Sequence, residues 1–301
     1  VTGVDQDGDG VRVHGHDGSG RAGTFHAAYA VGADGAHSVV RTLIGQPFPG
    51  KAVLRSIMLA DVELENPPDN LVTVNAVRDG FAFIAPYGDN LFRVIAWNRS
   101  HQVDDSAPVD REELRSTIRL AMGTDYGLGD VRWQSRFHSD ERQVPQYRTG
   151  RVFLAGDAAH VHSPAGGQGM NTGIQDAMNL GWKLAAVLDG ADDAVLGTYH
   201  SERHPVGRLV LRSSGATMRM MTVRPWILRK LRNGAVAALL GFPPIGDAVA
   251  RMFSGIGIGY GHDAAPRIRA WGIAAQEARR LADEFADWLR RGSPVQDVLP
   301  L

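Results

Sequence analysis

Cysteine is absent from the 301 residues of this sequence. Its absence excludes a disulfide-stapled scaffold, a zinc site built on thiolates, an iron–sulfur cluster and a catalytic cysteine. A chain without cysteine suits a reducing compartment, and the N-terminus shows no basic segment followed by an apolar run and a cleavage site. We therefore expect a cytoplasmic protein.

Long apolar segments and blocks of like charge are also missing. The longest uncharged apolar stretch, residues 234–244, is far shorter than the ~20 residues needed to cross a bilayer, and it ends in two prolines. Lysine and arginine number 32 against 33 aspartates and glutamates, and neither sign forms a long block. The sequence predicts no membrane span and no nucleic-acid partner.

Over the whole chain 44% of the residues are apolar and 22% are charged, which is typical of a globular protein. At roughly 150 residues per domain, the length suits two domains. Alternating residues and turn chemistry predict a β-hairpin or meander over residues 1–31. A buried strand, a glycine-bounded acidic turn and a short helix ending near Gly45 follow. A strand that enters a helix through glycine is typical of nucleotide-binding α/β layers.

The middle of the chain is predicted to be a sheet. Apolar alternation predicts strands at residues 52–64, 72–77, 81–85, 91–97 and 131–137, with a hairpin at residues 88–90. One helix interrupts them. It is predicted to begin at Asp110, with Glu113 completing a capping box, and to stop at Gly123.

The last part of the chain returns to the α/β pattern. Residues 151–155 are nearly all apolar and predict a fully buried strand, and helical spacing predicts helices over residues 170–188, 193–221 and 278–289. Trp133, Trp182 and Trp271 lie within apolar patterns, so we expect all three in the core.

Gly156 and Asp157 follow the buried strand directly. Ligands of open α/β sheets bind at this carboxyl edge. An ionised carboxylate only accepts hydrogen bonds, which suits the hydroxyls of a sugar or ribityl chain, and a glycine lets the ligand approach the backbone. The alternative is an aspartate that caps a helix N-terminus.

Glycines crowd residues 164–173, immediately before a predicted helix. A helix N-terminus offers unpaired amide donors and a partial positive charge, which suits a phosphate or a ring that accumulates negative charge. The alternative is an ordinary flexible loop. We do not assign a metal site to His160 and His162, because no third ligand is close in sequence, nor a hydrolase nucleophile to Ser163, which lacks a glycine-flanked turn.

These two segments resemble the FAD-dependent aromatic hydroxylases, the class A flavoprotein monooxygenases that include p-hydroxybenzoate hydroxylase-like, polyketide and rifampicin enzymes. Residues 31–41 resemble the family's DG motif, and residues 150–173 resemble its GD motif. The GD resemblance continues through Asp176, Asn179, Leu180, Trp182 and Lys183 to Tyr199, Glu202, Arg203 and Pro205. The resemblance covers about residues 1–205 and is weak beyond them.

The resemblance implies an α/β fold. Residues 1–46 and 150–205 would form a partial FAD-binding, Rossmann-like layer, and residues 47–149 an inserted β-sheet substrate-binding domain. Residues 206–301 would form a helical C-terminal region.

The resemblance also implies roles for individual residues. Asp157 would accept hydrogen bonds from the ribityl chain of FAD, with Gly156 giving clearance, and Pro164 would lie beside the isoalloxazine. The remaining implied cofactor-binding residues are Gly167, Gly169, Met170 and Asn171 at the helix start, near the flavin's pyrimidine edge, and Asp34, Gly35 and Arg41 near the pyrophosphate.

In this family NADH or NADPH reduces the flavin, dioxygen adds to give a flavin hydroperoxide, and its distal oxygen is transferred to an aromatic ring. The resemblance therefore implies a monooxygenase acting on a phenolic or polyketide-like compound, with Phe81, Phe83 and Phe92, beside Pro86, as candidate substrate contacts. It names no catalytic base. A same-fold flavin reductase or epoxidase, and an inactive remnant that only binds ligands, remain alternatives.

The sequence departs from the family at its start. The family opens with a strand, a GxGxxG turn and a helix that hold the ADP pyrophosphate. Here that spacing occurs only at residues 18–23, in a predicted hairpin turn that leads into a strand. We expect about a hundred further residues before Val1, the size of a βαβ unit with its extensions. Without that unit, FAD is expected to bind weakly or not at all.

Overall fold

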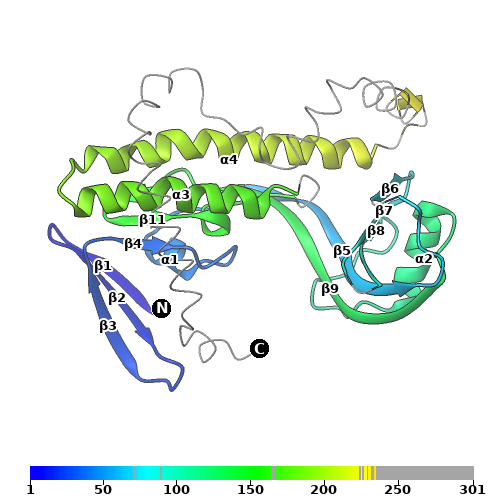
Figure 1. The fold of residues 1–301 in the computed structure, drawn as a ribbon, viewed down its shortest axis with the longest axis horizontal. Helices are drawn as coiled ribbons and strands as arrows, with labels where there is room; N and C mark the ends of the chain where they lie inside the picture. The colour runs from blue at the N-terminus through cyan, green and yellow to red at the C-terminus, as the bar shows by residue number, and fades with distance from the viewer. Residues whose placement is uncertain are drawn as a thin grey trace.

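The computed structural model describes residues 1–70, 72–88, 90–163 and 167–223, together with 225, 227–228, 230–231 and 234. Three sheets and two long helices organise this part of the chain (Figure 1). The predicted helix at residues 278–289, Trp271 and most of the C-terminal region from residue 224 onward lie outside the described residues. The predicted α/β fold is confirmed.

An antiparallel meander opens the chain. It consists of β1 (Gly3–Gln6), β2 (Val11–His16) and β3 (Ala22–Ala27). Between β2 and β3 the chain turns at Asp17, whose carbonyl accepts from the Gly20 amide at 2.9 Å. Residues 18–23, which carry the GxGxxG spacing, therefore form a hairpin turn and the start of a strand, as predicted.

A second small sheet brings the two motif segments together. In it β4 (Ala30–Gly32) pairs in parallel with β11 (Val152–Leu154), and β10 (Arg148–Thr149) pairs antiparallel with β11. A side chain at Gly32 would come within 2.8 Å of Val40 and 2.9 Å of Leu154, so only glycine fits between β11 and the following helix α1 (Val39–Leu43).

The largest sheet has six strands in the order β12-β9-β5-β8-β7-β6, all antiparallel to their neighbours. Its strands are β5 (Gly50–Leu64), β6 (Thr73–Ala76), β7 (Gly80–Pro86), β8 (Leu91–Asn98), β9 (Leu128–Gln143) and β12 (His160–Val161). The five predicted strands are confirmed. The two-residue β12 was not predicted, and it carries the GD segment onto the edge of this sheet.

Helix α2 (Arg111–Met122) covers one face of the six-stranded sheet. As predicted, Asp110 caps its N-terminus by accepting from two backbone amides, and Gly123 ends it with a φ of 83°. The reciprocal half of the capping box is not formed. The Glu113 carboxylate binds the buried Arg136 guanidinium at 2.6 Å instead of the cap amide.

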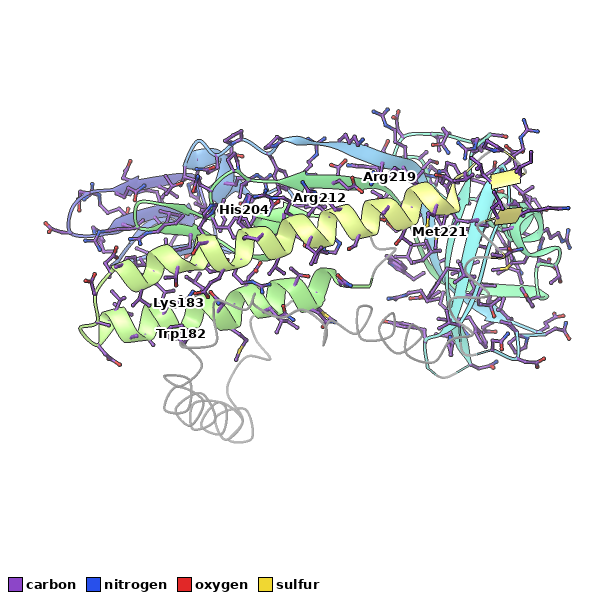
Figure 2. The ribbon with its side chains drawn as sticks, turned by 90° about the horizontal axis from the view of Figure 1, so that it is seen from above. Trp182, Lys183, His204, Arg212, Arg219 and Met221 are labelled. Atoms are coloured by element: carbon purple, nitrogen blue, oxygen red, sulfur yellow. The ribbon has the colours of Figure 1, made fainter. Side chains whose placement is uncertain are left out.

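Helices α3 (Gly169–Leu188) and α4 (Ala194–Met221) lie side by side, and both match their predictions (Figures 1 and 2). The far end of α4 reaches the six-stranded sheet, where Met221 packs against a core formed by Leu54, Ile57, Phe81, Trp97 and Met218. No described helix is both long and apolar enough to cross a membrane.

The prediction that the tryptophans are core residues is wrong for both of those described. Trp133 is 49% exposed and Trp182 is 38% exposed. Trp182 lies on the same outer side of α3 as Ile174 and Met178, which are also exposed. The apolar spacing of α3 thus extends over two sides of the helix, and only one of them is buried.

Candidate functional site

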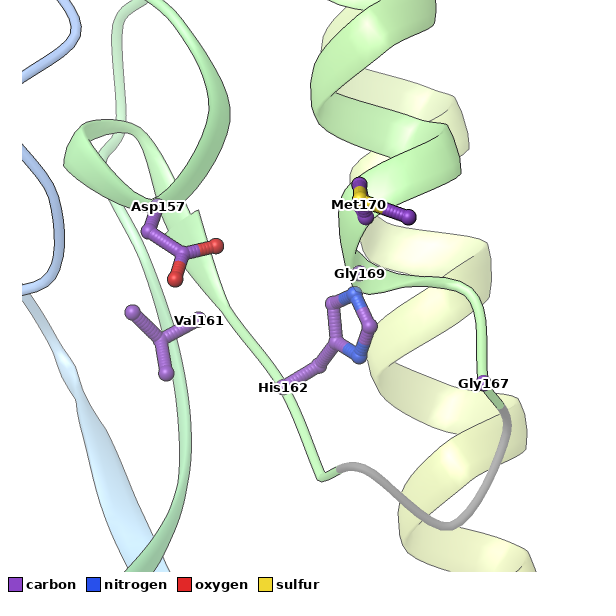
Figure 3. A pocket seen from close by; sticks show the side chains of 6 residues that line it. All are labelled: Asp157, Val161, His162, Gly167, Gly169 and Met170. Atoms are coloured by element: carbon purple, nitrogen blue, oxygen red, sulfur yellow. The ribbon is translucent and has the colours of Figure 1, made fainter. Parts of the chain in front are cut away.

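A pocket of about 390 Å³ lies where β11, β12 and α3 meet. Its lining residues, shown in Figure 3, are Asp157, Val161, His162, Gly167, Gly169 and Met170. Asp157 follows the carboxyl end of β11 in a single 3-10 turn, η1 (Gly156–Ala158), while Gly169 and Met170 open α3. Four of the predicted cofactor residues therefore share one pocket.

Asp157 presents its carboxylate to this pocket. Its side chain is exposed and makes no hydrogen bond to any described residue. The turn η1 has no side-chain cap, so the alternative reading of Asp157 as a helix cap is wrong. The position before it favours glycine, because Gly156 has a φ of 59°, which residues with a side chain rarely adopt. A Cβ added at Gly156 would also lie 3.7 Å from the Cα of Gly173 on α3.

The start of α3 forms the opposite wall. Gly167 has a φ of 62°, and the N-cap residue Gln168 makes no side-chain capping bond to the first turn. No acidic residue occupies that turn either. The positive end of the helix dipole therefore faces the pocket without a protein carboxylate on its own first turn.

A buried ionic network holds the GD turn against both long helices. Asp176 is fully buried, and its Oδ1 accepts from Nε of Arg203 at 2.7 Å. Its Oδ2 contacts Nε2 of His160 at 2.6 Å and accepts from the Gly156 amide at 3.1 Å. Burial alone would raise the pKa of Asp176, but the His160 and Arg203 interactions outweigh it and hold that pKa below its ordinary value.

The motif resemblance includes Asp176 and Arg203 but implies no role for either. A signal was present: Asp176 lies on the same helical side as Thr172 and Leu180, both buried, so a charge on that side required a buried partner. Which residue would supply it depends on how α4 packs. That packing is not encoded in any local spacing.

The DG residues lie outside the pocket. Asp34 accepts from the amides of Val39 at 2.8 Å and Val40 at 3.0 Å, and from the hydroxyl of Ser38, so its carboxylate caps α1. Burial would raise the pKa of Asp34, but these hydrogen bonds hold it below its ordinary value. Gly35 begins the turn with a φ of 80°. Contact of this segment with a pyrophosphate stays a prediction.

Arg41 ties the DG segment to the GD segment. It is 8% exposed, and its guanidinium donates to the carbonyl of Ala158 at 3.0 Å and to that of Ala36 at 2.8 Å. The same group lies 3.8 Å from the centre of the Phe48 ring. Its position supports a structural role for Arg41 between the two motifs.

Two further predicted cofactor residues, Pro164 and Asn171, are not among the described residues that line the pocket. Pro164 lies outside the described residues. Asn171 is described in the first turn of α3 but does not line the pocket. Among the described residues, no group of three histidine, aspartate or glutamate side chains could hold a metal ion.

The three candidate substrate phenylalanines lie on different faces of the six-stranded sheet. Phe81 is 5% exposed and stacks on Trp97, with ring centres 5.9 Å apart, in the core that receives Met218 of α4. Phe83 lies two residues along β7 and therefore shares that face. Phe92 instead packs in the core beneath α2. Only Phe83 combines partial exposure with the face that α4 reaches.

Comparison with known proteins identifies the family of this chain. The family model of the FAD binding domain matches residues 1–214. Over 262 residues the chain is 41% identical to an uncharacterized aromatic compound monooxygenase, YhjG, of Bacillus subtilis, with 86% of this chain and 52% of that protein covered. Over 230 residues it is 43% identical to a rifampicin monooxygenase of Streptomyces venezuelae, with 75% and 47% covered.

A solved structure gives the same relationship. The anhydrotetracycline hydroxylase OxyS of Streptomyces rimosus superposes with a TM-score of 0.71 at 36% identity, covering 87% of this chain and 52% of that chain. The chain thus spans about half the length of the relatives it matches. With the family model matching more than half of its residues, the chain belongs to the FAD-binding domain family of flavoprotein monooxygenases.

Proposed function

We propose that the protein containing this chain is an FAD-dependent monooxygenase that uses NADH or NADPH and dioxygen to hydroxylate an aromatic compound. One observation carries the proposal: the Asp157 carboxylate, without a partner among the described residues, faces the uncapped start of α3 across one pocket. The pocket offers hydrogen-bond acceptors on one wall and a positive helix end on the other.

These residues fit FAD. The ribityl chain carries hydroxyl donors, which an acceptor-only carboxylate such as Asp157 recognises. The positive end of α3 would stabilise negative charge on the pyrimidine edge of a flavin bound here. Bound FAD would supply the electron-transfer and oxygen-transfer chemistry that amino acids lack.

The chain's own contribution is to position the groups that line the pocket. Asp176 accepts from the Gly156 amide, and through Arg203 it ties α3 to α4, so the turn that carries Asp157 is joined directly to α3. Behind the pocket, β11 is fully buried in a core that also contains Ala158, Ala159 and Leu180, so the strand that ends at Gly156 is held firmly. Such preorganisation is what a site that stabilises developing charge requires.

The substrate class follows from the relatives. The names of the similar proteins include rifampicin and anhydrotetracycline as substrates, both of them polycyclic compounds with aromatic rings. We infer that this protein also acts on a phenolic or polyketide-like compound. Phe83 and the rest of its sheet face are the proposed apolar contacts for such a ring system.

FAD binding by the protein, with Asp157→Ala as the variant, tests the cofactor assignment. We expect FAD affinity to fall about tenfold or more, because the hydroxyls of the ribityl chain would lose a charged acceptor. Asp69→Ala removes an exposed carboxylate outside the pocket and serves as the matched control. Equal FAD affinity in the two variants would contradict the role of Asp157.

Product analysis tests the reaction. We supply the wild-type protein with FAD, NADPH or NADH and a panel of phenolic polyketides. The expected product is heavier by one oxygen atom, and that atom carries the isotope when the dioxygen is labelled. Oxidation of the nicotinamide without an oxygenated product would indicate a same-fold reductase, and an epoxide product would indicate an epoxidase. Binding of the aromatic compound without any flavin would indicate a binding module.

A further inference from the structure

His162 forms the wall of the pocket between β12 and the start of α3 (Figure 3). Its Nδ1 lies 3.1 Å from the carbonyl oxygen of its neighbour Ser163. Because a carbonyl oxygen only accepts hydrogen bonds, Nδ1 must carry the proton in this contact. In the neutral ring, Nε2 is then an acceptor.

The surroundings of His162 favour the neutral ring. Burial lowers the pKa of His162 below its ordinary value of 6.5, and the stacked ring of His160, 6.3 Å away between centres, acts in the same direction. The Ser163 contact and the charge of Asp157 oppose this lowering without reversing it. At neutral pH the His162 ring in the pocket wall is therefore neutral, and its Nε2 is a hydrogen-bond acceptor.

Nε2 of His162 is buried and has no hydrogen-bond partner among the described residues. It lies against Gly169, where a side chain would come within 3.6 Å of Nε2 and 3.4 Å of Cε1. Buried acceptors in folded proteins nearly always have a donor. A donor on a ligand in this pocket would supply the missing partner.

We propose that Nε2 of His162 accepts a hydrogen bond from FAD, so that His162 is a flavin-binding residue across the pocket from Asp157. This inference rests on the proposed function and adds a second acceptor to the site. Asp157 and His162 together select a ligand that presents several donors. FAD does so through its ribityl hydroxyls and the imide N–H of its ring.

Three variants of the protein, expressed from its complete coding sequence, test the role of Nε2. His162→Leu removes the acceptor, His162→Gln replaces it with an amide oxygen, and His26→Leu changes an exposed histidine on β3 as the matched control. The measurement is the dissociation constant of FAD, read from the quenching of flavin fluorescence, with the melting temperature of the flavin-free protein recorded for each variant.

We expect His162→Leu to weaken FAD binding about tenfold or more, the usual effect of removing one partner of a buried hydrogen bond. His162→Gln is expected to bind within about threefold of the wild type because its amide oxygen still accepts. The His26→Leu control should match the wild type.

Two results would overturn the inference. One is wild-type FAD affinity in His162→Leu. The other is equal weakening in the Gln and Leu variants together with equal loss of melting temperature, which would mean that the imidazole only fills space. If Asp157→Ala weakens FAD binding while His162→Leu does not, this inference alone fails. If the wild type binds no FAD, the proposed function fails first.

Discussion

At the scale of single residues, Asp176 is the most constrained side chain near the pocket. It is fully buried and is the common partner of Arg203, His160 and the Gly156 amide. Asp176→Asn keeps the shape but leaves the Arg203 guanidinium, 1% exposed, without a charged partner. We expect the free energy of unfolding to fall by about 3–5 kcal/mol, measured by urea denaturation.

An exposed ion pair provides the control for Asp176→Asn. Arg132 and Glu63 meet at 2.6 Å across β9 and β5, but the Arg132 side chain is 61% exposed. Arg132→Gln is expected to cost less than about 1 kcal/mol, since surface pairs are screened by water. A loss for Asp176→Asn as small as that of Arg132→Gln would show that the buried network does not stabilise the fold.

At the scale of elements, the N-terminus of α2 depends on Asp110. Its carboxylate accepts from the amides of Glu112 at 3.0 Å and Glu113 at 3.1 Å. Asp110→Ala is expected to cost about 1 kcal/mol of unfolding free energy and to speed amide hydrogen exchange in the first turn of α2. Asp110→Asn retains a capping oxygen and should behave like the wild type, so equal losses in both variants would contradict the capping role.

The same helix shows which elements a sequence predicts. Asp110 and Gly123 act on amides and carbonyls within four residues, and both ends of α2 were predicted correctly. Glu113 was expected to close the capping box, but Arg136 on β9 takes its carboxylate. The strand β12 also escaped prediction, because its two residues are a strand only through pairing with β9. Local chemistry is readable in the sequence, whereas competition from distant partners is not.

The same distinction separates the pocket residues that were predicted from the one that was not. Asp157 and the glycines before α3 were predicted because a strand end and a helix start leave local signals. His162 was considered only as a metal ligand. Its function as an acceptor depends on the Ser163 contact and on the approach of Gly169, neither of which is visible in sequence spacing.

At the scale of the whole molecule, ionised carboxylates join segments that are far apart in the chain. Asp193 at the start of α4 pairs with Arg148 of β10 at 2.6 Å, and Glu202 of α4 pairs with the buried Lys183 of α3 at 2.8 Å. Burial opposes the charge on Asp193 and Glu202, yet these partners hold both pKa values below their ordinary range. These pairs, which join α4 to β10 and to α3, therefore contribute to stability only while the carboxylates stay charged.

The stability of the whole chain is accordingly expected to fall in acid. A carboxyl group with a lowered folded pKa stabilises the fold above its unfolded pKa, here 3.8 for Asp and 4.5 for Glu, and that stabilisation is lost as the pH falls through the folded value. The half-buried His162 and His204 act in the same direction from pH 6.5 downward, because their partial burial lowers both pKa values and the unfolded chain binds the extra protons. His138, whose pKa is raised by Asp105, opposes this trend but is 40% exposed.

Urea denaturation between pH 3 and pH 8 measures this dependence. We expect the free energy of unfolding to decline gently below about pH 6.5, where histidine titrates, and steeply below about pH 4.5, where carboxylates titrate. In Asp176→Asn the steep part should be shallower, because that variant has already lost the most buried of these charges. A wild-type profile that stays flat down to pH 3, or an unchanged slope in Asp176→Asn, would show that interactions other than these ion pairs hold the helices to the sheet.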